Sequence, residues 1–341
     1  MKRIAFWALP LVLIATVAAQ GFAQAAAQDQ PKWKDTKEYD DFMLVYKATD
    51  PKEKAANAEK FFTDHKDADP IALTQNFQMM YLSYANAGNW GKVIESYEKM
   101  GPLAPRLPDA EKARFLQIAL LAATTSKNTP KSISLAEDIL KANPNDVQAL
   151  ITLSGLLAGS LPAQDPAKAT QIAKTLEVTN KALAQPKPAT IADAQWPQIQ
   201  QQLRETTCLM LLNQTKYPES IGECQAALKI NPKDGYAWYL IGMSHKAQLP
   251  PLIKKYNEAI AKYNAERDKD QITVDENRTA YQAHDKAASD KKDEAVDAFA
   301  RSAAIGGSAS AEAMKELKAL FMGTPEELNK LIDDKKAQTG N

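Results

Sequence analysis

Three histidines and several acidic clusters are the side chains in this sequence that suit metal binding or acid–base chemistry. The histidines are His65, His245 and His284. None of them stands in an H-E-x-x-H or similar spacing, which would bring two imidazoles together as metal ligands. The acidic residues around Asp268–Asp270 lack the central glycine and the terminal glutamate that a calcium loop needs. We therefore expect no metal site, and we expect His245 to be a packed side chain with one polar edge.

Motifs for nucleophilic catalysis and phosphate binding are also missing. The run GNWGK at residues 88–92 lacks the full glycine-lysine-serine loop that wraps a phosphate, so we interpret it as a turn between two helices. The sequence has no G-x-S-x-G, and acidic pairs are too common along the predicted helices to single out a hydrolase dyad. The sequence therefore predicts a protein that is not an enzyme and that takes no cofactor.

The composition argues against nucleic-acid binding. Lys and Arg together number 42, as do Asp and Glu, so no excess of basic residues is available to contact phosphates. With 45% hydrophobic residues among 341, the chain can bury a substantial core.

The first residues have the form of a secretory signal peptide. Lys2 and Arg3 precede an apolar run over Ile4–Ala19, and small residues lead to Ala25, the predicted cleavage site. An uncleaved anchor is the alternative, but 16 apolar residues fall short of the ~20 that span a bilayer. Cleavage of residues 1–25 leaves 40 basic and 42 acidic residues, a net charge of −2. We expect a bacterial protein that is periplasmic or secreted, is not stably inserted in the membrane, and starts with a flexible linker at residues 26–35.

Helical periodicity dominates the rest of the chain, and it repeats. In the stretch KYPESIGECQAALKINPKDGYAWYLIGMSHKA, residues 216–247, Trp238 and Gly242 share one helical face, and Pro232 ends the preceding helix. This stretch resembles the tetratricopeptide repeat (TPR), a 34-residue helix–turn–helix unit with the pattern W-x2-L-G-x2-Y, then A-x3-F, then P. Small residues, here Gly222, Ala227 and Gly242, are expected where the helices approach most closely.

The same register recurs along the chain, which resembles the exported TPR family over most of residues 36–305. About six units are expected, with starts near Thr36, Thr74, Ala113, Val147, Gln201 and Gly235. The resemblance implies an all-α solenoid that winds into a right-handed superhelix, in which the first helices of successive units line a concave groove.

Two insertions and a terminal segment depart from the repeat. Residues 158–200 hold a helix near Ala167–Leu183 and a proline-marked loop, which is either a lid over the groove or a lengthened connector. Residues 250–290 begin with a helical stripe of Ile253, Tyr256, Ile260 and Tyr263 and continue as a polar run. This insertion is expected to be mostly helical and to project from the solenoid as a solvated element. Residues 306–341 are expected to form two capping helices, the second started by Thr324, Pro325 and Glu327.

The resemblance also indicates where a ligand would bind. In such repeats the exposed positions of the first helix face the groove; here they are Asp40, Leu44, Gln78, Leu82, Gln117, Leu121, Glu205, Leu209, Tyr239 and Met243. The lysine and asparagine with which chaperone-binding members clamp a carboxylate are absent. We therefore expect a protein or peptide partner held by apolar and amide contacts, with weak salt dependence. The alternative for Leu82, Leu121 and Leu209 is packing against neighbouring helices.

These features favour a non-enzymatic binding scaffold. A structural assembly subunit of a cell-envelope complex is the main alternative, since it would share the fold and differ in having a permanent partner. A cell-wall-active enzyme is a weaker one, because the residues after the solenoid are too few for a catalytic module.

The two cysteines are expected to form a disulfide. Cys208 and Cys224 lie on the opening and closing helices of one unit, each 8 residues from Lys216 at the turn between them. Residues equidistant from the turn of an antiparallel helical pair lie side by side, and an exported protein meets an oxidising compartment. The alternative is two buried free thiols.

Overall fold

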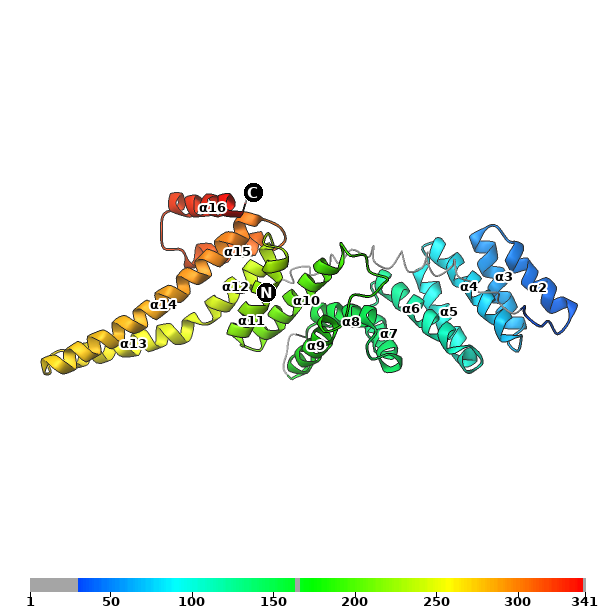
Figure 1. Ribbon diagram of the computed structural model, residues 1–341, viewed down its shortest axis with the longest axis horizontal. Helices are drawn as coiled ribbons and strands as arrows, with labels where there is room; N and C mark the ends of the chain where they lie inside the picture. The colour runs from blue at the N-terminus through cyan, green and yellow to red at the C-terminus, as the bar shows by residue number, and fades with distance from the viewer. Residues whose placement is uncertain (1–29, 163–165, 340–341) are drawn as a thin grey trace. The chain divides into compact units, whose positions relative to one another are not determined.

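The structure is a computed structural model that describes residues 30–162 and 166–339, and in these residues every regular element is helical (Figure 1). The predicted all-α class is thus confirmed for this part of the chain. The predicted signal peptide lies outside the described residues, and so does most of the predicted linker. No helix in the described ranges is long and apolar enough to span a bilayer.

The chain forms two compact units whose boundary falls between Leu156 and Leu157, within one helix. The helices of the N-terminal unit are α2 (Thr36–Lys47), α3 (Pro51–Asp64), α4 (Pro70–Asn86), α5 (Trp90–Met100), a 3₁₀ turn (Gly101–Arg106), α6 (Asp109–Thr125), α7 (Thr129–Ala142) and the start of α8 (Val147–Gly159). Successive helices pack as neighbours from α2 to α7. Their core is rich in aromatic rings; Phe62 and Phe77, for example, meet edge to face with centroids 4.6 Å apart.

Beyond the end of α8, the C-terminal unit contains the remaining helices. They are α9 (Ala167–Leu183), α10 (Trp196–Asn213), α11 (Tyr217–Ile230), α12 (Gly235–Ala247), α13 (Leu249–Glu266), α14 (Gln271–Ile305), α15 (Ser310–Leu320) and α16 (Pro325–Thr339). Residues 158–200, predicted to be a lid or a connector, supply α9 and a loop whose Ile191 is buried. In the larger core cluster of this unit, Phe299 of α14 contacts α12, and a smaller cluster joins Ala158, Ile172 and Met210.

The turns inside three helical pairs repeat one backbone geometry. In the α4–α5, α6–α7 and α10–α11 turns, one residue has positive φ: Gly88 at 68°, Lys127 at 58° and Thr215 at 59°. The backbone N–H of the next residue then donates to the carbonyl five positions earlier: Asn89 to Tyr84 at 2.8 Å, Asn128 to Ala123 at 2.9 Å and Lys216 to Leu211 at 3.0 Å. The GNWGK run is therefore a helix–helix turn, as predicted, with Asn89 capping α5.

The connections between consecutive pairs also repeat. Asn143–Asp146 links α7 to α8, and Asn231–Asp234 links α11 to α12, each with the letters N-P-x-D. In both, the aspartate N–H donates to the asparagine carbonyl, at 3.0 and 3.2 Å. The aspartate side chain then accepts from a backbone N–H in the first turn of the next helix. Proline follows the end of one helix, as predicted for Pro232, and aspartate caps the start of the next.

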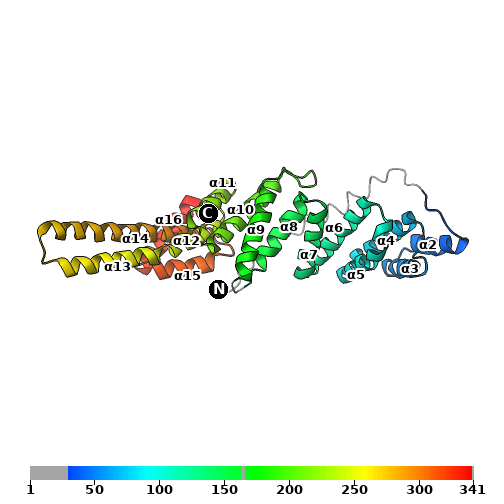
Figure 2. The ribbon, with the colours of Figure 1, turned by 90° about the horizontal axis from the view of Figure 1, so that it is seen from below.

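Helices α13 and α14 form a long antiparallel hairpin that extends away from the rest of the C-terminal unit (Figure 2). The polar run after α13, in an insertion expected to be mostly helical, is the first part of α14, a continuous helix of 35 residues. Asp270 caps it by accepting from the backbone N–H of Thr273 at 3.0 Å. The tyrosines Tyr263 and Tyr281 face each other across the hairpin with ring centroids 5.0 Å apart.

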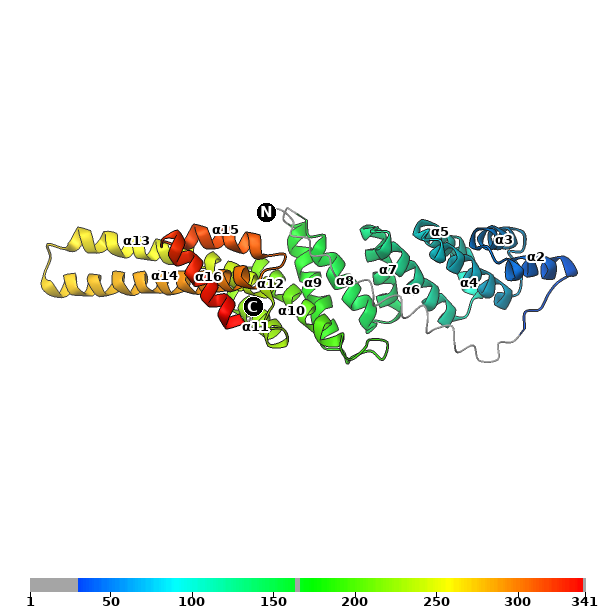
Figure 3. The same cartoon turned by 90° about the horizontal axis from the view of Figure 1, so that it is seen from above.

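Two short helices end the chain beside the base of this hairpin (Figure 3). The capping signature predicted for the last helix is confirmed: the backbone N–H of Thr324 donates to Glu327 Oε2 at 2.7 Å, and that of Glu327 donates to Thr324 Oγ1 at 3.3 Å. Asp297 of α14 pairs with Lys335 of α16, which holds the last helix against the unit.

Candidate functional site

The predicted ligand-facing positions differ in accessibility, and those of the N-terminal unit are the more accessible. Asp40 and Gln117 are exposed, and Leu44 is 58% exposed. Gln78 is half-buried and donates from Nε2 to Glu111 Oε2 at 3.3 Å, so α4 and α6 are linked at this point. The predicted surface therefore has open apolar and amide groups on α2 and α6.

The remaining leucines largely follow the packing alternative. Leu82 and Leu209 are half-buried against the core clusters of their units, and Met243 is packed in the same way. Leu121 is half-buried. Only part of each of these side chains is accessible to a ligand, because the rest is buried by helix packing.

Two predicted positions are not exposed at all. Glu205 and Tyr239 are each only 9% exposed, so the prediction that they face a ligand is wrong. Tyr239 contacts Phe299 of α14, with ring centroids 6.0 Å apart, because the returning part of α14 packs on α12. Glu205 faces Gln201 and the start of α12.

Sequence reasoning missed two aromatic side chains on α2. Tyr39 and Tyr46 are 43% and 64% exposed. Phe42 and Val45, on the neighbouring stripe, make the contacts with the core instead. Tyr39 and Tyr46 recur at helical spacing, but periodicity alone does not say which of two adjacent stripes of a helix is buried. The exposed side of α2 thus carries Tyr39, Leu44 and Tyr46.

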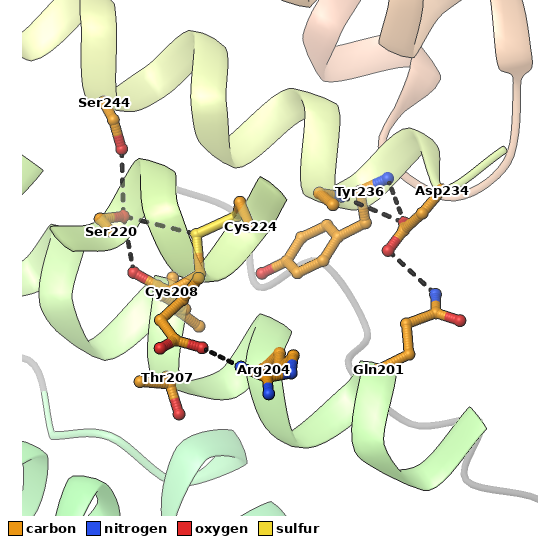
Figure 4. Close-up of a disulfide and its surroundings, with 12 residues drawn as sticks. Gln201, Arg204, Thr207, Cys208, Ser220, Cys224, Asp234, Tyr236 and Ser244 are labelled. Carbon is orange, nitrogen blue, oxygen red and sulfur yellow. Dashed lines mark hydrogen bonds and ion pairs between the residues drawn. A yellow bond between two sulfur atoms is a disulfide. The ribbon is translucent and has the colours of Figure 1, made fainter. Parts of the chain in front are cut away.

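Cys208 and Cys224 are joined by a disulfide, with Cα atoms 5.5 Å apart (Figure 4). Both residues are fully buried, and the bridge ties α10 to α11. Ser220 lies beside it and donates from Oγ to the carbonyl of Cys208 at 2.8 Å, while Ser244 Oγ of α12 lies 3.2 Å from Ser220 Oγ. The predicted pairing is therefore present, with a buried hydroxyl pair extending it to a third helix.

The histidines serve local contacts. His245 Nδ1 lies 2.9 Å from Glu294 Oε2, and the ring is otherwise packed, as expected. Its burial lowers the pKa of His245 below the ordinary value, although Glu294 opposes this. His65 Nε2 lies 2.8 Å from Asp41 Oδ2. In the described part of the chain, no three His, Cys, Asp or Glu residues are grouped as metal ligands would be.

An acidic pair in the C-terminal unit has unusual surroundings. Gln201 Nε2 lies 2.9 Å from Glu205 Oε1 and 2.9 Å from Asp234 Oδ2. Burial, and after it the hydrogen bond with Asp234, raises the pKa of Glu205 to about 9. Figure 4 shows Gln201 reaching across to Asp234, at the start of α12.

Comparison with known proteins adds no family or relative. No protein-family model matches the chain, and none of the curated proteins is significantly similar to it.

Proposed function

We propose that the chain is an exported, non-enzymatic binding scaffold of the tetratricopeptide type, which holds a protein or peptide partner through its first helices. The observation that supports it most is the recurrence of one turn geometry in three helical pairs, with the same φ sign and the same five-residue hydrogen bond. Helical hairpins that repeat their turns stack in register, which is how such proteins build a continuous binding surface.

The accessible side chains support the chemistry of the ligand. Leu44, Tyr39 and Tyr46 on α2 and Gln117 on α6 supply apolar and amide contacts. Aromatic and aliphatic groups of this kind bind peptides mainly by burying apolar area, which salt screens little. The binding surface that we propose is therefore in the N-terminal unit, on α2 and α6.

A peptide library selected on the full chain tests the proposal. A selected peptide, labelled with a fluorophore, is titrated by anisotropy against the wild type, Leu44→Ser, Gln117→Ala and the control Ile272→Ser, which changes another exposed aliphatic residue, on α14. We expect the first two variants to weaken binding by about tenfold each, equivalent to about 1.4 kcal/mol. The control should bind like the wild type, and the affinity should change little between low and moderate salt.

Other outcomes separate the alternatives. Failure to select any peptide would count against the scaffold. So would selected peptides that bind both variants as tightly as they bind the wild type. A stoichiometric partner retained through detergent solubilisation would favour the assembly subunit. Turnover of cell-wall fragments by the purified chain would favour the enzyme.

A further inference from the structure

Two carboxyl groups lie enclosed between α10 and the start of α12. Glu205 is 9% exposed and Asp234 is 7% exposed. One amide nitrogen, Gln201 Nε2, is 2.9 Å from an oxygen of each. The other oxygen of Asp234 accepts from the backbone N–H groups of Tyr236 at 2.9 Å and Ala237 at 3.1 Å, and so caps α12.

No cation is among the groups that shift the pKa of the Glu205 carboxyl. The polar groups that act on the Glu205 carboxyl are the Asp234 carboxyl and the Gln201 amide. Tyr236 is the third titratable group nearby, and burial raises the pKa of its phenol above the ordinary value, so it stays neutral. The helices packed against α10 or α12 are α9, α11, α13, α14 and α15, and their buried side chains are uncharged. The half-buried Arg204 of α10 pairs with Glu223 of α11. Two ionised carboxylates here would repel each other with little solvent to screen them.

The two carboxyl groups are not equivalent. Asp234 accepts two backbone N–H bonds, from Tyr236 and Ala237, at the N-terminus of α12. Glu205 lies in the middle of α10, where no backbone donor is free, because interior N–H groups are bonded within the helix. Of the two, Glu205 is the carboxyl whose pKa is raised, by burial first and then by its hydrogen bond with Asp234, so the proton is assigned to Glu205.

We propose that Glu205 and Asp234 share one proton, and that this proton fastens the start of α12 to α10 as a pH-sensitive latch. When the proton leaves, two buried negative charges remain beside each other, and separation of the helix start from α10 relieves their repulsion. This separation would also disturb the neighbouring contacts of α12. The backbone carbonyl of Gly235, the first residue of α12, accepts a hydrogen bond from Ser302 Oγ of α14 at 2.7 Å.

The direction of the pH effect follows from linkage. The pKa of Glu205 in the folded unit, about 9, is above its ordinary value of 4.5. Its contribution to stability is fully present below about pH 4.5 and declines as the pH rises toward 9, because only the opened form ionises in that window. Each opening releases at most one proton, so the equilibrium constant for opening rises by at most tenfold per pH unit.

Hydrogen exchange on the full chain, read by mass spectrometry at pH 6 to 9 and corrected for intrinsic rates, measures this opening helix by helix. In the wild type, we expect opening of α10 and α12 to increase several-fold per pH unit. In Glu205→Gln, which keeps the shape and hydrogen bonds without a titrating proton, it should stay constant. Glu219→Gln is the matched control, because it removes an exposed acidic charge from α11 and should behave like the wild type. Helix α4 gives an internal reference in the N-terminal unit.

Infrared spectroscopy of the wild type reads the proton itself. A protonated carboxyl should be present at pH 7, disappear at higher pH, and be absent from Glu205→Gln. Equal pH dependence of exchange in the wild type and Glu205→Gln would overturn the proposal, and so would a wild-type spectrum without a protonated carboxyl at pH 7. The spectrum of the wild type decides the question even if Glu205→Gln does not fold.

Discussion

Gly242 lies where α12 and α14 touch. A Cβ atom built there would be 2.6 Å from two ring carbons of Phe299, a separation that real Cβ atoms do not show. We expect Gly242→Ala to lower the free energy of unfolding by about 1–3 kcal/mol, because the added methyl overpacks a filled contact. Urea unfolding followed by fluorescence measures this.

Gly222 is a matched control within the same unit. It is exposed in the middle of α11, and a Cβ there would meet no atom within 4 Å. Gly222→Ala should therefore stabilise by about 0.5–1 kcal/mol through helix propensity alone. If both alanine variants changed stability in the same direction, the close approach at Gly242 would not be the cause.

These glycines also show how far single residues can be predicted. The pattern correctly placed Gly242 and the buried Ala227 at close approaches, because their slots face a neighbouring helix. It was wrong about Gly222, which faces open space. The exposure expected for Tyr239 failed for a related reason: the helix that covers it, α14, comes from beyond a long insertion. Local spacing predicts which residues share a face, whereas tertiary packing decides what covers that face.

At the scale of elements, the hairpin of α13 and α14 is separable from the core. Its outer part, residues 250–290, contributes no member to the buried core cluster of the C-terminal unit. Its seam has its own contacts, such as Asn277 Nδ2 donating to Glu266 Oε2 at 2.9 Å. By contrast, Phe299 at the base of α14 is fully buried in the core cluster.

We expect removal of residues 254–283, with Ile253 joined to His284 by a short glycine-rich turn, to change the unfolding free energy of the remaining unit by less than about 1 kcal/mol, the usual range for groups outside a core. Tryptophan fluorescence in urea measures this, since the segment contains no tryptophan. Phe299→Ala is the comparison and should cost about 3–5 kcal/mol. A loss of comparable size on deletion would show that the hairpin supports the core.

The sequence predicted the hairpin only in part. The stripe from Ile253 to Tyr263 correctly indicated α13, because its apolar residues recur at helical spacing. The insertion was expected to be mostly helical, but the continuity of its polar run with the helix that carries Phe299 was not predicted. Val274 and Asn277 are the only buried residues of α14 before Ala295, so little apolar periodicity marks this part of the helix. A two-helix hairpin needs few apolar residues, and a polar seam leaves little periodicity to detect. The predicted unit starts at Thr36, Val147 and Gly235 are the first residues of α2, α8 and α12. The predicted starts at Thr74, Ala113 and Gln201 instead fall inside α4, α6 and α10.

At the scale of the whole molecule, the disulfide distinguishes the two units. Both cysteines belong to the C-terminal unit, and the bridge closes a short loop between α10 and α11. In the chain-entropy account, a loop of this length stabilises by about 3 kcal/mol. We expect the double variant Cys208→Ala, Cys224→Ala to lose about that much in the C-terminal unit, with the N-terminal unit unchanged.

Native-state hydrogen exchange separates the two responses, with α4 reporting on one unit and α11 on the other. Thiol titration of the unreduced, denatured wild type should find no free thiol. An equal loss of protection in both units would mean that they unfold together, and two titrating thiols would mean that the bridge is not formed in solution.

The length of the hairpin also affects the order in which the chain can fold. Most helices pack against a neighbour in sequence, so those pairs close small loops and can form early. The pairing of α12 with the base of α14 is different, because the whole outer hairpin lies between them in the chain. The entropic cost of closing that loop falls sharply once α13 and the outer part of α14 have paired, because the paired hairpin holds the two ends of the loop close together. We therefore expect the hairpin to form before Phe299 packs against Gly242, and the C-terminal unit to become compact only after the hairpin has formed.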